Sequence, residues 1–222
     1  MALRQRKIAP AIAVALEAVL LMAVTGPGTA RVGRSARASV AGAGHNHSIP
    51  KDLSRKQVRK LAMPLARARV ATAKYATDLD AAKADGYTMT ITQMIPDMGH
   101  HFLNPNITEF DVTKPPILVY VRDGDDWQLV AFEWVFTEKP ARRPLPGATY
   151  GSFAAACHYE DGTFVFKKKE ANCSDTSPES GEPFTFWHPK LVTLHLWVWY
   201  PNPDGLFNGT NRWVRPYNDE QV

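Results

Sequence analysis

Two hydrophobic periodicities follow one another along the chain after its first 50 residues. From residue 65 to 84 the apolar positions recur every three or four residues, with charged side chains between them, which predicts an amphipathic helix. Gly86 is placed to end this helix. A shorter helix, capped by Asp52 or Ser54, is expected just before it, and Pro64 marks a break or a new helix start.

Beyond Gly86, apolar and polar residues alternate, which is the period of a half-buried strand. Turn residues at 123–126 and 161–162 predict two antiparallel hairpins, and the proline-rich segment 140–146 predicts a loop. Helices followed by a run of strands indicate an α+β domain, with N-terminal helices packed on a mainly antiparallel sheet. The sequence leaves open whether this sheet forms a partial barrel. The expected strands are residues 87–94, 117–122, 127–136, 157–160, 163–167 and 191–200.

The first 30 residues have the organisation of a secretory signal peptide: a basic start, an apolar stretch at residues 8–24 and small residues before Ala30. Glu17 interrupts the apolar stretch, which argues against a membrane span of about 20 residues, and no span is expected in the mature chain. We therefore expect secretion to the cell envelope or beyond. The expected divisions are a signal peptide (1–30), a flexible basic leader (31–50), a single α+β domain (51–217) and a C-terminal tail (218–222).

Charge is distributed unevenly along the chain. The 26 Lys and Arg residues and 22 Asp and Glu residues give a net charge of +4. Residues 31–60 hold eight basic residues and only one acid, Asp52, whereas residues 61–222 hold 15 basic and 20 acidic residues. A nucleic-acid-binding protein carries its positive charge on the folded domain, so we expect no nucleic-acid partner.

The two cysteines, Cys157 and Cys173, are 16 positions apart. An isolated pair in an exported chain favours a disulfide, which would stabilise the fold by about 3 kcal/mol in the chain-entropy model. Metal ligation by the thiolates is the alternative. It normally needs further ligands about two to five residues away, and His158 directly follows Cys157, where adjacent side chains on a strand point apart.

Two histidine clusters carry the strongest chemical signal. His100 and His101 follow Gly99, and His195 lies within an aromatic strand. Histidine is the commonest metal ligand. Glu133 is the acid of interest, because a carboxylate among largely apolar residues is costly to bury unless it is paired or bound to a cation. Two imidazoles and one carboxylate from separate strands match a metal site with open positions.

We expect His101, His195 and Glu133 to be the metal ligands, with Glu133 also the candidate catalytic base. The alternates or outer partners are His100, Asn104 and His188. One ring of the His100–His101 pair is expected to point inward and the other outward. Each residue also fits a purely structural role, such as a histidine bonded to a backbone carbonyl, or Glu133 paired with a basic side chain on an exposed sheet face. The sequence leaves both interpretations open.

Large aromatic residues are the second chemical signal, with six Trp in the chain. If residues 191–200 form one regular strand, Trp197 and Trp199 share a face with His195. Aromatic rings beside a few polar groups are typical of a small-molecule pocket, so these two residues are the candidate ligand face. They suit a core beneath the helix equally well.

Three spaced motifs combine these residues. They are Met98-Gly99-x-His101-Phe102-x-Asn104, Val130-Ala131-x-Glu133 and His195-x-Trp197-x-Trp199-x-x-Asn202-Pro203-x-Gly205-x-Phe207. The set resembles a family of uncharacterised exported proteins common in actinomycetes and other bacteria. The resemblance covers roughly residues 71–207 and implies export and a single domain, but no activity.

The sequence as a whole favours binding of a divalent transition metal, Zn, Cu or Fe, through His101, His195 and Glu133, and it leaves open whether the protein is an enzyme. The alternatives are a non-enzymatic module that binds a small ligand or partner through its Trp face, and a structural envelope protein. The expected partner is thus a metal ion or small molecule. The oligomeric state is not set by the sequence.

Overall fold

The computed structural model describes residues 53–219, so the expected signal peptide, the leader and most of the C-terminal tail lie outside the described residues. Three helical segments come first: α1 (Arg55–Thr72), the 3-10 helix η1 (Ala73–Tyr75) and α2 (Leu79–Ala84). Two further 3-10 helices are η2 (Glu170–Asn172) and η3 (Arg215–Tyr217). The strands are β1 (Met89–Ile95), β2 (Gly99–Leu103), β3 (Ile117–Asp123), β4 (Asp126–Phe136), β5 (Gly151–Phe153), β6 (Ala156–Tyr159), β7 (Phe164–Phe166), β8 (Phe184–His188) and β9 (Leu191–Leu196).

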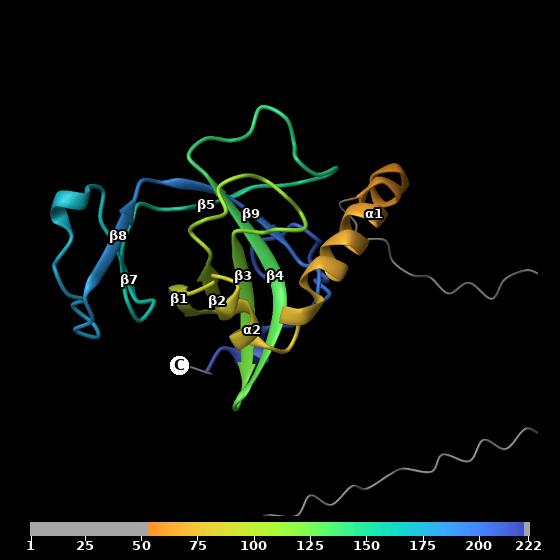
Figure 1. The fold of residues 1–222 in the computed structure, drawn as a ribbon. Helices are drawn as coiled ribbons and strands as arrows, with labels where there is room; N and C mark the ends of the chain where they lie inside the picture. Colours follow the sequence, from red (N-terminus) through yellow and green to blue (C-terminus); the bar gives the residue numbers. More distant parts are fainter. Residues whose placement is uncertain (1–52, 220–222) are drawn as a thin grey trace, which may run out of the picture. The chain divides into compact units, whose positions relative to one another are not determined.

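Two antiparallel sheets hold all of these strands (Figure 1). The larger sheet has the order β1-β2-β3-β4-β9-β5 and curls into a half-barrel, whereas the smaller has the order β7-β6-β8. Both expected hairpins are present, as β3–β4 and β6–β7. The predicted α+β class, with helices on a mainly antiparallel sheet, is therefore confirmed.

The helical region differs from the prediction in where it breaks. Ser54 caps the start of helix α1 through a capping box with Gln57, and the helix continues through Pro64 instead of breaking there. The break comes after Thr72, where the expected 65–84 helix divides. The carbonyl of Tyr75 accepts from the Tyr120 hydroxyl, which is a contact with the sheet that the helical period cannot reveal.

After this break, α2 restarts and stops on local signals. The Asp78 side chain accepts from the amide of Ala81 and caps the start of the helix. The amide of Gly86 donates to Lys83, and that of Tyr87 donates to Ala82, which is a Schellman motif. Gly86 adopts a φ of 100°, so its predicted role as the helix stop is confirmed.

The larger sheet separates two apolar clusters. The helix-side cluster includes Leu61 and Ala68 of α1 with Phe132, Trp134 and other sheet residues. The opposite cluster is smaller and is formed by Met94, Val119, Val121, Val130, Ala131, Trp197 and Val214. Side chains of alternate strand residues go to opposite faces, so each strand contributes to both clusters.

Two irregularities change which side chains share a face. In β4, Val119 pairs with Ala131 and Tyr120 with Leu129, so Val130 is an extra, bulged residue. Leu129 therefore packs on the helix side rather than with Glu133, and Val130 packs on the opposite side, the reverse of simple alternation. In β1, a second shift lies between Thr90 and Thr92, which pair with consecutive residues of β2.

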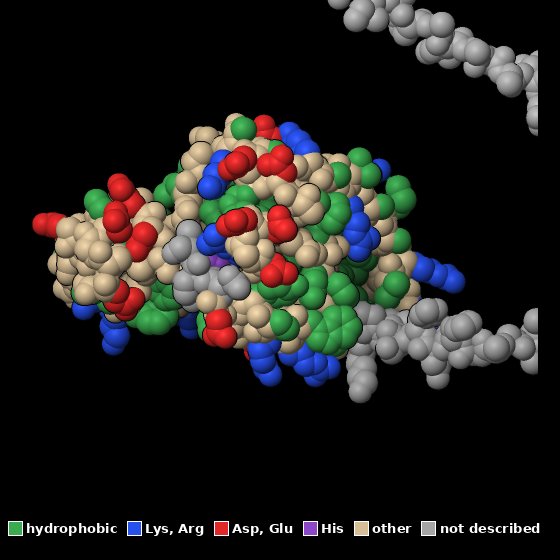
Figure 2. Space-filling view, turned by 90° about the horizontal axis from the view of Figure 1, so that it is seen from below, with side chains coloured by type: hydrophobic (Ala, Val, Ile, Leu, Met, Phe, Trp, Pro, Cys, Tyr) green, Lys and Arg blue, Asp and Glu red, His purple; other side chains and the backbone are tan. Residues whose placement is uncertain are grey.

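The described histidines are almost entirely internal. Acidic and basic side chains are interspersed on the face seen in Figure 2, where only a trace of imidazole is visible. His100, His101, His158 and His195 are each no more than 3% exposed. Among residues 53–219, no helix has the length and apolar character needed to cross a membrane.

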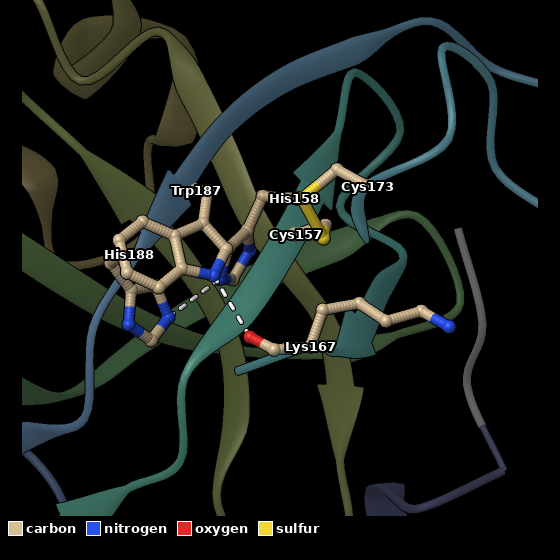
Figure 3. Close-up of a disulfide and its surroundings, with 6 residues drawn as sticks. All are labelled: Cys157, His158, Lys167, Cys173, Trp187 and His188. Carbon is tan, nitrogen blue, oxygen red and sulfur yellow. Dashed lines mark hydrogen bonds between the residues drawn. A yellow bond between two sulfur atoms is a disulfide. The ribbon is translucent and has the colours of Figure 1, made fainter. Parts of the chain in front are cut away.

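Cys157 and Cys173 form the predicted disulfide, which ties β6 to the segment after η2 (Figure 3). It closes a loop with a sequence separation of 16. We expect the double variant Cys157→Ser/Cys173→Ser to lose about 3 kcal/mol of unfolding free energy in urea, because the unfolded chain gains the freedom that the crosslink removes. A reductant should destabilise the wild type equally and leave the variant unchanged. A loss below about 1 kcal/mol would contradict this account.

Candidate metal centre

Strands β2, β4 and β9 of the larger sheet position His101, Glu133 and His195, and β3 lies between β2 and β4. His101 lies on β2 and pairs with Val119 of β3, which in turn pairs with Ala131 of β4. Glu133 is two residues beyond Ala131, and it pairs directly with His195 of β9. All three side chains therefore project from the face opposite the helices.

The three functional groups converge at one point. Glu133 places one oxygen 2.9 Å from Nε2 of His195 and the other 3.5 Å from Nε2 of His101. Each residue offers one ligand atom within 4.8 Å of those of the other two, and all three residues are buried. The buried His101–Glu133–His195 group, called the triad below, can hold a metal ion.

A fourth side chain orients the first imidazole. Oγ1 of Thr92 on β1 forms a 2.7 Å hydrogen bond with Nδ1 of His101, and Thr92 and His101 are paired residues. When His101 uses Nε2 to bind a metal, its Nδ1–H donates to Thr92, which is the usual outer contact of a ligating histidine. For His195, Nδ1 has no hydrogen-bond partner among residues 53–219.

The protonation of the triad suits cation binding. Burial lowers the pKa of His101 to about 4, although Glu133 opposes this shift. For Glu133, burial acts to raise the pKa, but the charges of His195 and His101 and the His195 hydrogen bond bring it below its usual value. At neutral pH the triad thus offers a neutral imidazole at His101 and an ionised carboxylate at Glu133, which are the forms that ligate metals.

The alternates predicted from sequence lie elsewhere. His100 lies on the opposite face of β2 from His101, but both rings are buried because the sheet is covered on both faces, so the expectation of one outward ring is wrong. The His100 ring packs edge-on against Trp127. The Asn104 side chain donates to the carbonyl of Asp85 and accepts from the amide of Asn106. Asn104 therefore holds the turn after β2 against the end of α2 and is not a partner of the triad.

The two tryptophans of the expected ligand face lie on different sides of the sheet. β9 ends at Leu196, so the alternation assumed for residues 191–200 does not extend to Trp199. Trp197 is 3% exposed, and its indole donates to the carbonyl of Asn208. Trp199 packs against the helix-side cluster and donates to Thr72. These placements favour core packing over contact with a ligand.

His188 does not join the triad but pairs with His158. Their Nε2 atoms lie 3.0 Å apart at the junction of β6 and β8 (Figure 3). The two residues are 30 positions apart, so no short spacing motif connects them. The sequence feature that could have indicated this pair is the aromatic segment 184–188, because such a segment is typical of a buried strand and His188 is its last residue.

Two cavities open on this part of the molecule, but neither is lined by a triad residue. One of about 430 Å³ is lined by residues of β1 and of the β6–β7 turn, and one of about 370 Å³ lies beside the β3–β4 turn and Tyr217. The triad therefore does not form the floor of either of these two cavities. Comparison of the chain with protein families, curated proteins and solved structures found no match.

Proposed function

We propose that this is an exported metal-binding protein in which His101, Glu133 and His195 hold one divalent transition metal ion of the Zn, Cu or Fe group. The convergence of the three buried ligand atoms within 4.8 Å carries the proposal. Sequence alone favoured the same residues. Two imidazoles and one carboxylate are a recurrent ligand set for such ions.

The spacing of the ligand atoms supports a shared ion. Metal–ligand bonds of about 2.1 Å place neighbouring ligands about 3.0 to 3.4 Å apart in octahedral or tetrahedral geometry. One oxygen of Glu133 lies 2.9 Å from His195 and its other oxygen lies 3.5 Å from His101, just outside this range at either end. Binding of one ion therefore requires side-chain rotations that draw the ligand atoms, now within 4.8 Å of one another, closer together.

The charge of the triad supports the same conclusion. An ionised carboxylate that is only 8% exposed is unfavourable unless a cation balances it. A bound dication supplies that charge. As a ligand, Glu133 needs no contact with a substrate, so its role here is coordination rather than general-base catalysis.

The test is metal analysis of the untagged native protein and three variants. We expect about one equivalent of a transition metal in the wild type and none in Glu133→Gln or His195→Gln, because each variant removes one of three ligands. The control is His100→Gln, which changes a buried histidine of the same strand that faces away from the triad. A metal-free wild type that also fails to take up Zn²⁺, Cu²⁺ or Fe²⁺ would refute the proposal.

A second prediction concerns the outer contact of His101. Thr92→Val preserves the shape of the side chain and removes the hydrogen bond to Nδ1 of His101. We expect metal affinity to fall about 10- to 100-fold without loss of stoichiometry at saturation, as is typical for outer partners of metal-bound histidines. Thr92→Ser keeps the hydroxyl and should retain most of the affinity. Competition with a chromogenic chelator measures both variants.

Export is the second part of the proposal. The signal-peptide organisation of residues 1–30 supports it, as do the resemblance of the motifs to exported actinomycete proteins and the disulfide, which persists in oxidising compartments. Expression of the full chain in an actinomycete host should yield extracytoplasmic protein with a processed N-terminus. Retention of the intact chain in the cytoplasm would contradict this part.

A further inference from the structure

Helix α1 concentrates positive charge on a domain that is otherwise acidic. Its 18 residues include six Lys or Arg and no Asp or Glu, whereas residues 73–219 hold 13 basic and 19 acidic residues. The helix therefore carries a charge of +6 and the remainder of the domain a charge of −6, with the histidines neutral. It lies at the edge of the domain, on the helix side of the larger sheet (Figure 1).

The inward and outward faces of α1 differ in composition. Leu61, Ala68 and Thr72 are buried and follow the spacing of one helical face, which packs on the sheet. The helical period of 3.6 places another set of side chains together on the outward side. All of its members are exposed, and we call the set the outer stripe: Lys56, Arg59, Lys60, Met63, Arg67 and Val70.

Two apolar side chains lie within the outer stripe. Met63 is 62% exposed and Val70 is 80% exposed, which are the largest exposed fractions among the exposed large hydrophobic residues of the described domain. Single exposed apolar residues are ordinary on soluble proteins. Here, however, the two most exposed ones are seven positions apart on one helical face, with cations between and beside them.

The cations of the outer stripe have no acidic partner in the part of the chain that the structure describes, 53–219. Elsewhere in the domain, basic side chains do pair with carboxylates. The paired ones are Lys74, Arg122, Arg212 and Arg215. The positive charge of the outer stripe is therefore not balanced within the domain.

This distribution of charge disfavours the helix itself. Lys56 and Lys60 are four positions apart, and like charges at this spacing destabilise a helix. The first turn contains Arg55 and Lys56 but no acid, although the helix macrodipole favours acids there. Helix formation thus gives no reason for these cations, whereas a negatively charged partner on the outward side does.

We propose that the outer stripe of α1 binds the surface of an anionic phospholipid bilayer. Basic residues are attracted to the anionic headgroups, and long Lys and Arg side chains reach them while their stems contact apolar groups. Met63 and Val70 enter the boundary between headgroups and acyl chains. The helix lies along the surface rather than across the bilayer, because its inward face remains packed on the sheet.

The exposed apolar pair favours a bilayer over a soluble polyanion. A nucleic acid or another hydrated polyanion would be bound chiefly through its charge and would leave Met63 and Val70 in water. A bilayer removes both side chains from water, which adds to the electrostatic attraction.

Binding through α1 is independent of the triad. The triad projects from the face of the larger sheet opposite the helices, so a bilayer on the outer stripe lies on the other side of the domain from it. Lipid binding and metal binding therefore do not compete, and either proposal can fail alone.

The test is co-sedimentation with vesicles of mixed phosphatidylglycerol and phosphatidylcholine. The full chain and the chain that begins at residue 31 are both measured, because the apolar residues 8–24 could themselves bind lipid. We expect both to bind at about 0.1 M salt and to be released at about 0.5 M salt, since salt screens the attraction. Binding by the full chain alone would show that residues 1–30 account for it and would overturn the proposal.

Lys60→Gln/Arg67→Gln removes two cations of the outer stripe and keeps good helix formers. We expect vesicle affinity to fall about 25-fold, since each basic residue near an anionic surface contributes about fivefold. Lys168→Gln/Lys169→Gln is the matched control, because it removes two exposed cations from the segment after β7. It should change the affinity less than about twofold. An outer-stripe variant that binds as tightly as the wild type would refute the proposal.

Met63→Gln/Val70→Gln keeps every cation and tests the apolar contribution. We expect its vesicle affinity to fall at least about tenfold, whereas its retention on a heparin column should equal that of the wild type. An undiminished vesicle affinity would show that charge alone drives binding and that the bilayer proposal is wrong. Urea unfolding should show both outer-stripe variants to be at least as stable as the wild type, which excludes misfolding as the cause of weaker binding.

Discussion

Gly99→Ala is expected to destabilise the protein by about 3 to 5 kcal/mol, because the backbone at this position excludes a side chain. Gly99 has a φ of 130°, and a Cβ atom there would lie 2.5 Å from the carbonyl oxygen of Tyr120 and 2.9 Å from Cγ1 of Val119. Both contacts belong to β3, against which β2 is paired. The strand would have to move, and His101 lies only two residues further on.

Urea unfolding of metal-free Gly99→Ala measures this loss, and metal analysis should show that the variant no longer holds the ion of the triad. Gly124→Ala is the matched control. Gly124 also has a positive φ, 59°, but no atom lies within 4 Å of the position that a Cβ atom would take there. It should therefore lose only about 1 to 2 kcal/mol, from conformation alone. Equal losses in the two variants would show that the contacts with β3 do not matter.

Acidification is expected to remove about 3 kcal/mol of stability for each of His101 and His158 in the metal-free protein. Both have a folded pKa of about 4 against an ordinary value of 6.5. The unfolded chain takes up these protons first as the pH falls. The contribution of each histidine is therefore complete above about pH 6.5 and is lost progressively as the pH falls to about 4.

Glu133 adds to this loss at the lower end, because its pKa is lowered in the fold and its contribution disappears when the carboxyl group is protonated. Urea unfolding with a chelator present measures the histidine contributions between neutral pH and about pH 4.5 and the Glu133 contribution below it. His158→Gln should show about half of the pH dependence assigned to the two histidines. An unfolding free energy that does not change over this range would contradict the proposed burial of neutral imidazoles.

The sequence predicted those features that depend on local period and on chemistry within one strand. Glu133 and His195 were named from their chemistry within their own strands, and the structure pairs them across β4 and β9. The turn residues predicted the antiparallel hairpins. An isolated cysteine pair in a chain expected to be exported predicted the disulfide, and the conformational freedom of glycine predicted the helix stop at Gly86. Each of these signals lies within a few residues or depends on composition.

Features that depend on contacts distant in sequence were missed. The helix breaks after Thr72 because the next carbonyls bond to the sheet instead of within the helix. The carbonyl of Tyr75 accepts from the Tyr120 hydroxyl, and that of Ala76 accepts from the amide of Leu129. The bulge at Val130 moves the side chain of Leu129 to the opposite face of the sheet from the one that alternation predicts. No residue type in that strand indicates the bulge. The His158–His188 pair arises because β6 and β8 are adjacent in the smaller sheet, which a single sequence does not disclose.

The direct pairing of Glu133 with His195 also makes metal binding depend on the register between β4 and β9. A slip of β9 by one residue would turn Leu194 or Leu196 toward Glu133 and carry His195 into the apolar layer beneath α1. A misaligned molecule would lack the complete ligand set. Metal binding at the triad would then favour the native register, since only correctly registered molecules could retain the ion.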